Sequence, residues 1–225
     1  MKKIVMLAVG MGMIFAGIFG GSLLTGEGEE NKFSYTKISI ENKKIVDSSN
    51  FMEIQGSVAH DIAADNQFEK SEEVIYGRIT KVDYLIYHNT PWTKLEIGCK
   101  ESFKGDIERD QRISAYVLGG YLDKKSYEKK FDDADVPMDD DALVEMKYFQ
   151  NELSKVGDEG VFYLVSDDED AIFEKDAYFF LCSGYSKMMY DKKSGDIKET
   201  AYEGIKKVPK NDFFSKIKAK KKQVR

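Results

Sequence analysis

The alternation of hydrophobic and polar residues along the middle of this chain predicts β-strands. Residues 71–88 and 93–103 alternate with a period of two, which is typical of strands with one buried face. Shorter apolar runs at 112–121, 160–167 and 176–185 predict three further strands. The chain is therefore expected to be built mainly from sheet, with turns at its polar and glycine-containing segments.

Glycines mark the points where these strands should bend or end. Gly77 lies inside the first long strand and predicts a bulge. Gly105 suits a turn with positive φ after the second strand. The Gly119-Gly120 pair predicts a sharp corner, because the polar run after it is not the helix that a phosphate-binding loop requires.

Outside these strands, the pattern predicts a possible strand at 33–40, a hairpin turning at 193–196, and two helices. The first helix covers 57–70, with Ser57 as its cap. The second covers 142–156, with an apolar stripe at helical spacing and Gly157 as its stop. Both helices would lie against the sheet.

The N-terminus predicts export. Lys2 and Lys3 precede residues 4–24, which contain no charged side chain. Residues 1–26 are therefore expected to be a cleaved signal peptide, or else a retained anchor in which residues 4–24 tether the chain to the membrane. The remainder would be secreted or extracytoplasmic.

Three segments follow the predicted signal peptide or anchor at residues 1–26. Residues 27–56 form an N-terminal arm, 57–205 form one domain, and 206–225 form a basic tail. The tail is interpreted either as a solvated, disordered end or as a segment that contacts the anionic cell envelope or lipid headgroups.

Composition and charge argue against a nucleic-acid partner and against a metal site. The formal net charge of −6 argues against a nucleic-acid partner. Cys99 and Cys182 are expected to be buried thiols, with a disulfide as the alternative that export permits. His60 and His88 have no cysteine at ligand spacing, so neither a metal nor another cofactor is expected.

Four stretches together resemble a loosely defined group of exported proteins of Gram-positive bacteria. The stretches are "YGRITKV", "FKGD", "LGGY" and "GDEGVFYLVSD", in that order, followed by a glycine-turn hairpin. The resemblance covers roughly residues 68–200, and Leu118 replaces the proline that usually precedes the glycine pair. It implies a mainly β (α+β) fold, namely an OB-like five-stranded antiparallel barrel with one or two flanking helices.

A more distant resemblance is to the inhibitory barrel of tissue metalloproteinase inhibitors. Those proteins depend on a disulfide-linked N-terminal cysteine, which this chain lacks.

Aromatic residues provide the candidate binding site. OB-like barrels bind ligands on the face of their second and third strands and on adjacent loops. We expect Tyr87, Trp92, Tyr116 and Tyr121 to lie there, with Trp92 in a polar turn, although core packing is the alternative for each of them. No catalytic residue is predicted.

The sequence therefore predicts a non-enzymatic binding or interaction module of the cell envelope, with a protein or glycan as its partner. One alternative is a secreted hydrolase with residues in the barrel loops, which requires a pocket holding a titratable group of strongly shifted pKa. The other is an interaction domain like a protease inhibitor, which requires an exposed apolar patch near Trp92.

Overall fold

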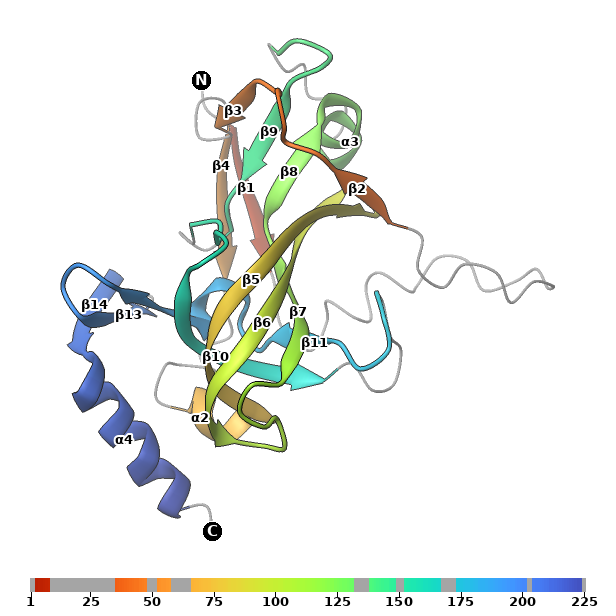
Figure 1. The fold of residues 1–225 in the computed structure, drawn as a ribbon. Coiled ribbons are helices and arrows are strands. Elements are labelled where there is room, and N and C mark those ends of the chain that lie inside the picture. Colours follow the sequence, from red (N-terminus) through yellow and green to blue (C-terminus); the bar gives the residue numbers. More distant parts are fainter. Residues whose placement is uncertain are drawn as a thin grey trace, which may run out of the picture.

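The structure, a computed structural model, is mainly β (Figure 1). It describes residues 3–8, 35–47, 52–57, 66–131, 138–148, 152–166, 173–201 and 204–223. The largest sheet contains β2 (Thr36–Ile38), β5 (Glu73–Tyr87), β6 (Thr90–Lys104), β7 (Arg112–Leu118), β10 (Glu159–Ser166), β11 (Tyr178–Phe180), β12 (Lys187–Asp191), β13 (Asp196–Ala201) and β14 (Gly204–Pro209). The two long predicted strands are confirmed as β5 and β6, and the possible strand at 33–40 as the short β2.

The other elements are two small sheets and the helices. A second sheet contains β3 (Ile45–Asp47), β8 (Gly120–Asp123) and β9 (Leu143–Met146), and a third pairs β1 (Lys3–Ala8) with β4 (Met52–Ser57). The helices are α2 (Gln67–Lys70), α3 (Lys124–Lys130), α4 (Lys210–Gln223) and the 3-10 turn η3 (Ser183–Ser186).

Strand pairing in the large sheet returns to its starting strand. The order β5, β6, β7, β11, β10 ends with β10 paired to β5 again. Four of these five pairings are antiparallel, and the pairing between β7 and β11 is parallel. The prediction of purely antiparallel strands is therefore wrong for β7 and β11. The chain passes through β8, β9 and β10 before it reaches β11, so it arrives beside β7 in the same direction.

A pair of glycines allows β5 to fit between its two neighbours. Gly77 lies opposite Gly160 of β10, and the β5–β6 register shifts between Tyr76 and Gly77, which confirms the predicted bulge. A Cβ atom on Gly77 would lie 2.6 Å from Cγ2 of Ile97. A Cβ atom on Gly160 would lie 2.7 Å from the carbonyl oxygen of Met188. Both positions therefore exclude a side chain unless the neighbouring strand moves.

The turn after β6 closes around a buried carboxylate. Gly105 has a φ of +86°, as the sequence predicts for this turn. The Glu73 carboxylate accepts hydrogen bonds from the backbone N–H of Asp106 at 2.7 Å and of Ile107 at 3.2 Å. Any Cβ atom on Gly105 would collide with this carboxylate.

The Gly119-Gly120 pair makes the predicted corner. Both residues have positive φ, +113° and +144°, at the point where the chain leaves β7 and starts β8 in the second sheet. No α-helix begins at this pair, because the chain continues directly into β8. The corner moves the chain from one sheet to the other.

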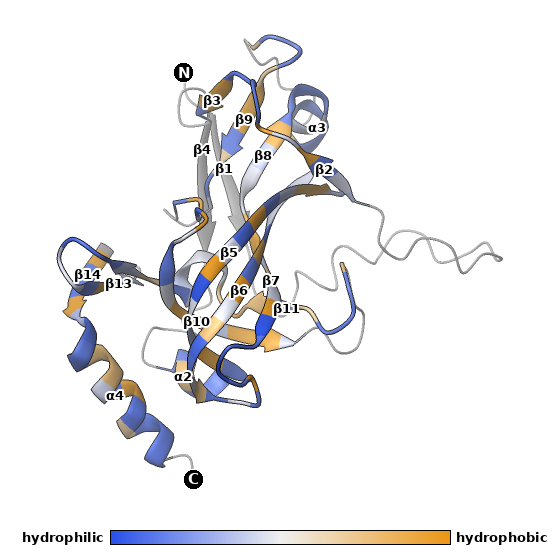
Figure 2. Ribbon diagram, viewed as in Figure 1, coloured by the Kyte–Doolittle hydropathy of each residue, from blue (hydrophilic) through white to orange (hydrophobic). Residues whose placement is uncertain are grey.

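The side chains between the paired strands form a buried apolar cluster. Figure 2 shows hydrophobic and hydrophilic residues alternating along β5 and β6. Their inward positions join those of β7, β10 and β11 in one buried cluster, which includes Ile75, Ile79, Leu95, Ile97, Cys99, Phe162, Leu164 and Phe180. Burial of this kind contributes roughly 1.5–3 kcal/mol for each large side chain relative to its exposed state.

The predicted helix at 142–156 is wrong. Leu143–Met146 is strand β9, which pairs with β8 and β3, and residues 152–155 have no regular structure. The alternating residues Ala142, Val144, Met146 and Tyr148 share one buried cluster. Their period of two fits a strand, and β9 forms because β3 and β8 lie on either side to pair with it.

Within the described residues, the end of the predicted helix at 57–70 is helical, as α2. Ser57 is not its cap, since it is the last residue of β4. Residues 58–65, with His60, lie outside the described residues.

Trp92 lies in a strand, so its predicted position in a polar turn is wrong. The turn between β5 and β6 consists of His88 and Asn89, whose φ values are +48° and +55°. Strand β6 begins at Thr90 and therefore includes Trp92. Two consecutive residues with positive φ make a shorter hairpin than the sequence suggested.

The basic C-terminal segment is ordered for most of its length. Residues 210–223 form α4, which packs Phe213 and Ile217 against the body, each with 3% of its surface exposed. The ring of Phe214 lies 5.1 Å from that of Tyr76 and 5.0 Å from that of Phe103. The interpretation of the whole tail as a disordered end is therefore wrong for these residues.

The N-terminal prediction is largely outside the described residues. Lys3–Ala8 forms β1, parallel to β4, and residues 9–34 are not described. In the part of the chain that the structure describes, no helix combines the length and apolarity needed to cross a bilayer.

Candidate functional site

Three of the four aromatic residues predicted to bind a ligand are buried. Trp92, Tyr116 and Tyr121 expose 8%, 1% and 8% of their surface, and Tyr87 is half-buried. Tyr116 stacks on Phe173 with 4.3 Å between ring centroids and 6° between planes. Trp92 meets the same ring edge-on at 5.3 Å. These contacts give Trp92 and Tyr116 a packing role.

Of the other two predicted residues, Tyr121 packs away from this cluster and Tyr87 lies at its margin. Tyr121 lies edge-on to Tyr84 at 4.7 Å, on the second sheet rather than beside Trp92. Tyr87 contacts Phe173 at 5.4 Å at the margin of the Trp92 cluster. The structure therefore brings Tyr87, Trp92 and Tyr116 together around Phe173, but not on an open surface.

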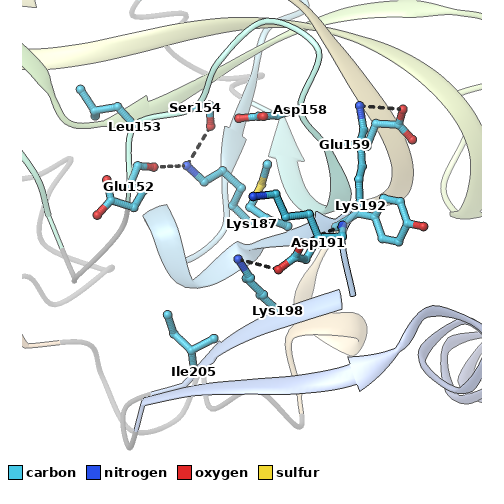
Figure 3. A pocket seen from close by; sticks show the side chains of 13 residues that line it. Glu152, Leu153, Ser154, Asp158, Glu159, Lys187, Asp191, Lys192, Lys198 and Ile205 are labelled. Atoms are coloured by element: carbon cyan, nitrogen blue, oxygen red, sulfur yellow. Dashed lines mark hydrogen bonds and ion pairs between the residues drawn. The ribbon is translucent and has the colours of Figure 1, made fainter. Parts of the chain in front are cut away.

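A pocket of about 580 Å³ lies elsewhere, between residues 152–158 and the β12–β13 hairpin (Figure 3). Its lining is Glu152, Leu153, Ser154, Asp158, Glu159, Lys187, Met189, Tyr190, Asp191, Lys192, Lys193, Lys198 and Ile205. The volume is in the range of small-ligand sites. Basic and acidic side chains alternate around it, so it suits a polar ligand better than an apolar one.

Lys187 is the central side chain of this pocket. It is the first residue of β12, opposite Phe162 of β10, and it exposes only 2% of its surface. Its Nζ donates hydrogen bonds to the carbonyl oxygen of Glu152 and to Oγ of Ser154, both at 2.8 Å. Figure 3 shows this side chain reaching from the strand to the facing segment.

Burial makes Lys187 unusual among the lysines of this chain. Removal from water lowers the pKa of its ammonium group from 10.5 to about 8, although the negative charges of Asp158 and Glu152 oppose the shift. A substantial fraction of Lys187 is therefore neutral at mildly alkaline pH. A lysine in this state can act as a base as well as a hydrogen-bond donor.

The segment that carries Ser154 is held in place by backbone hydrogen bonds. The N–H of Gly157 donates to the carbonyl of Ile79 at 2.9 Å, and the N–H of Ile79 donates to the carbonyl of Asp158 at 2.9 Å. Asp158 also accepts from the backbone N–H of Lys155 at 2.8 Å through its carboxylate. The Ser154 hydroxyl is thus presented to Lys187 from a segment fixed to β5.

A second group of charges surrounds Glu159 at the edge of the pocket. Its carboxylate accepts a 2.5 Å hydrogen bond from the Tyr76 hydroxyl and forms an ion pair with Lys100 at 2.9 Å. Burial alone would raise the pKa of Glu159, but the bonds from Tyr76 and Lys100 hold it below its usual value. Lys210 of α4 donates to the same Tyr76 hydroxyl at 2.9 Å. Glu159 is therefore charged and links α4 to the pocket wall.

The rim of the pocket carries further ion pairs. Lys198 lies 3.1 Å from Asp191, and Lys192 donates to the carbonyl of Gly157 at 3.0 Å while lying 3.8 Å from Glu159. These contacts arrange both signs of charge around the opening. Such a rim can bind a ligand that carries a carboxylate or phosphate, an amine, or both.

Among the described residues, no group of three or more His, Cys, Asp and Glu side chains is placed to hold a metal ion. Cys99 and Cys182 are both buried as free thiols, so the expected burial is confirmed.

Comparison with models of known protein families and with curated proteins finds no match to this chain. The function is therefore argued from the pocket. The sequence does not identify its two central residues: Ser154 falls in the predicted helix at 142–156, and Lys187 lies before the hairpin turn predicted at 193–196. A lysine at the start of an apolar strand signals burial only once its partner segment is known.

Proposed function

We propose that this protein is an exported, non-enzymatic binding module of the cell envelope, built on an OB-like five-stranded barrel. Support for the barrel comes from the pairings that run from β5 through β6, β7, β11 and β10 back to β5. A closed order of this kind leaves no free edge among the five strands, as in small Greek-key barrels. Support for export comes from the uncharged residues 4–24 behind Lys2 and Lys3.

The single observation that supports binding is the pocket around Lys187. Its charged lining favours a glycan that carries ionic groups, with a charged segment of a protein as the alternative partner. Tyr190 supplies an aromatic ring in the same lining, which could pack against a sugar ring. The pocket replaces the aromatic strand face as the proposed site, because Trp92 and Tyr116 are buried.

Calorimetric titration with soluble muropeptides, the glycan–peptide fragments of bacterial cell wall, tests this function. We expect saturable binding to the full chain, weakened roughly tenfold by Lys192→Glu because the substitution reverses a charge at the rim. Lys175→Glu is the matched control, since Lys175 is exposed and outside the pocket. Muropeptides that fail to bind, or that bind both variants equally, would contradict the proposal.

One observation favours a hydrolase as the second candidate, namely the 2.8 Å contact between Lys187 Nζ and Ser154 Oγ. Serine–lysine pairs are one form of activated nucleophile. Neutral Lys187 would take the Ser154 proton while Oγ bonds to the carbonyl carbon of an ester. The bond to the leaving alkoxide would then break, and Lys187 would return the proton to that alkoxide. Water would release the acyl group from Ser154.

Labelling with a fluorophosphonate distinguishes the two candidates. A hydrolase would form one phosphonyl adduct on Ser154, detected by peptide mass spectrometry. The adduct would vanish in Ser154→Ala but persist in Ser126→Ala, because Ser126 lies on α3 and does not line the pocket. The binding module that we propose forms no adduct at Ser154. An adduct there that also requires Lys187 would replace our first candidate with the second.

A further inference from the structure

The charge of this protein is distributed very unevenly. Residues 204–223 contain eight lysines and one acidic residue, Asp212, whereas the whole chain has a formal net charge of −6. The rest of the chain is therefore strongly acidic. This asymmetry gives the molecule one positive region on a negative body, which is a pattern expected for a protein that orients on a charged surface.

Five of these lysines are exposed on β14 and α4. They are Lys206, Lys207, Lys216, Lys218 and Lys222, and we call them the lysine surface. Lys218 also contacts Glu101 at 2.7 Å. No ion pair within the described residues is recorded for the other four. Their ammonium groups are exposed to solvent.

The lysine surface is a fixed platform. Helix α4 is attached through buried Phe213 and Ile217, and Lys220 lies 3.6 Å from Glu69. Lys210 at the start of α4 lies over the Tyr76 ring at 4.0 Å. Because Phe213 and Ile217 are buried against the body, the exposed positions of α4 are mainly polar. Figure 2 shows hydrophilic and hydrophobic residues mixed along this helix.

We propose that the lysine surface binds the anionic headgroups of a phospholipid bilayer. Basic clusters are attracted to anionic leaflets, and each nearby lysine strengthens binding roughly fivefold. The acidic body would be repelled by the same leaflet, so only one orientation of the molecule is favourable. A single-stranded nucleic acid fits less well, because such partners need exposed aromatic rings between the basic residues. The aromatic residues of α4, Phe213 and Phe214, face the body instead.

Co-sedimentation of the full chain with vesicles tests this proposal. One vesicle population contains phosphatidylglycerol and phosphatidylcholine, and the other contains phosphatidylcholine alone. The variant carries Lys206→Glu, Lys207→Glu, Lys216→Glu and Lys222→Glu. Its matched control carries Lys37→Glu, Lys43→Glu, Lys125→Glu and Lys129→Glu, which reverse the same number of exposed charges on β2, α3 and the segment between β2 and β3. Figure 1 shows these elements at the opposite end of the molecule from α4.

We expect partitioning onto anionic vesicles to fall roughly 500-fold or more in the variant, and to change much less in the control. It should also weaken as salt rises, because screening shortens the reach of the charges. Residues 4–24 would add the same apolar contribution to both vesicle types. Equal binding of the wild-type chain to both vesicle types would overturn the proposal, as would equal losses in the variant and the control. Binding of the wild-type chain to RNA but not to vesicles would also overturn the proposal. Circular dichroism checks that both variants are folded.

Discussion

Tyr116→Ala is expected to lower the free energy of unfolding by about 3–5 kcal/mol. Tyr116 exposes 1% of its surface and stacks on Phe173, so the substitution leaves a cavity in the buried aromatic cluster. Urea denaturation followed by circular dichroism measures the change. A residue that only binds a ligand on an open surface would tolerate the same substitution.

Tyr87→Ala is the matched control for Tyr116→Ala. Tyr87 belongs to the same aromatic group but is half-buried at its margin, so we expect less than about half of the loss. Equal stability of the wild-type chain and the Tyr116→Ala variant would contradict the packing role and would restore the aromatic strand face as a candidate ligand site.

Raising the pH from 7 to 10 should stabilise the wild-type chain relative to Lys187→Met by about 2–3 kcal/mol. The pKa of Lys187 is about 8 in the folded chain and 10.5 when the side chain is solvated. Between these values the unfolded chain holds a proton that the folded chain has released. The free energy of unfolding therefore rises with pH through this window, and below it the charged Lys187 costs stability.

Methionine removes the titrating group while keeping an unbranched side chain in the space. Near pH 7 the two proteins should have similar stabilities, since a buried charge can often be replaced by an apolar group at little cost. Tyrosines titrate in both proteins, so their contribution cancels in the difference. A difference between wild type and variant that stays constant from pH 7 to 10 would show that Lys187 is not titrating in this range.

The sequence predicts the long strands and their glycines well because those signals are local. The alternation in β5 and β6 and the positions of Gly77, Gly105 and Gly119 each follow from a few neighbouring residues. A strand of this kind is recognised by its period of two, and a glycine of this kind by one backbone conformation that favours it.

The wrong predictions arise where pairing with a segment distant in the sequence determines the conformation. Leu143 and Met146 fit a helical stripe, but pairing with β3 and β8 makes them a strand. Ser154 and Lys187 are 33 residues apart and meet because β12 pairs with β10 while residues 157 and 158 are bonded to β5. A pattern within one segment contains no information about such a meeting, so the pocket could not be predicted.

Hydrogen–deuterium exchange of the full chain, with and without soluble muropeptides, tests the proposed pocket most directly. The account predicts slower exchange in 152–158 and 187–198 when the fragments are present, and no change around Trp92 and Tyr116. Protection confined to β6 and β7, or no protection anywhere in the chain, would contradict it.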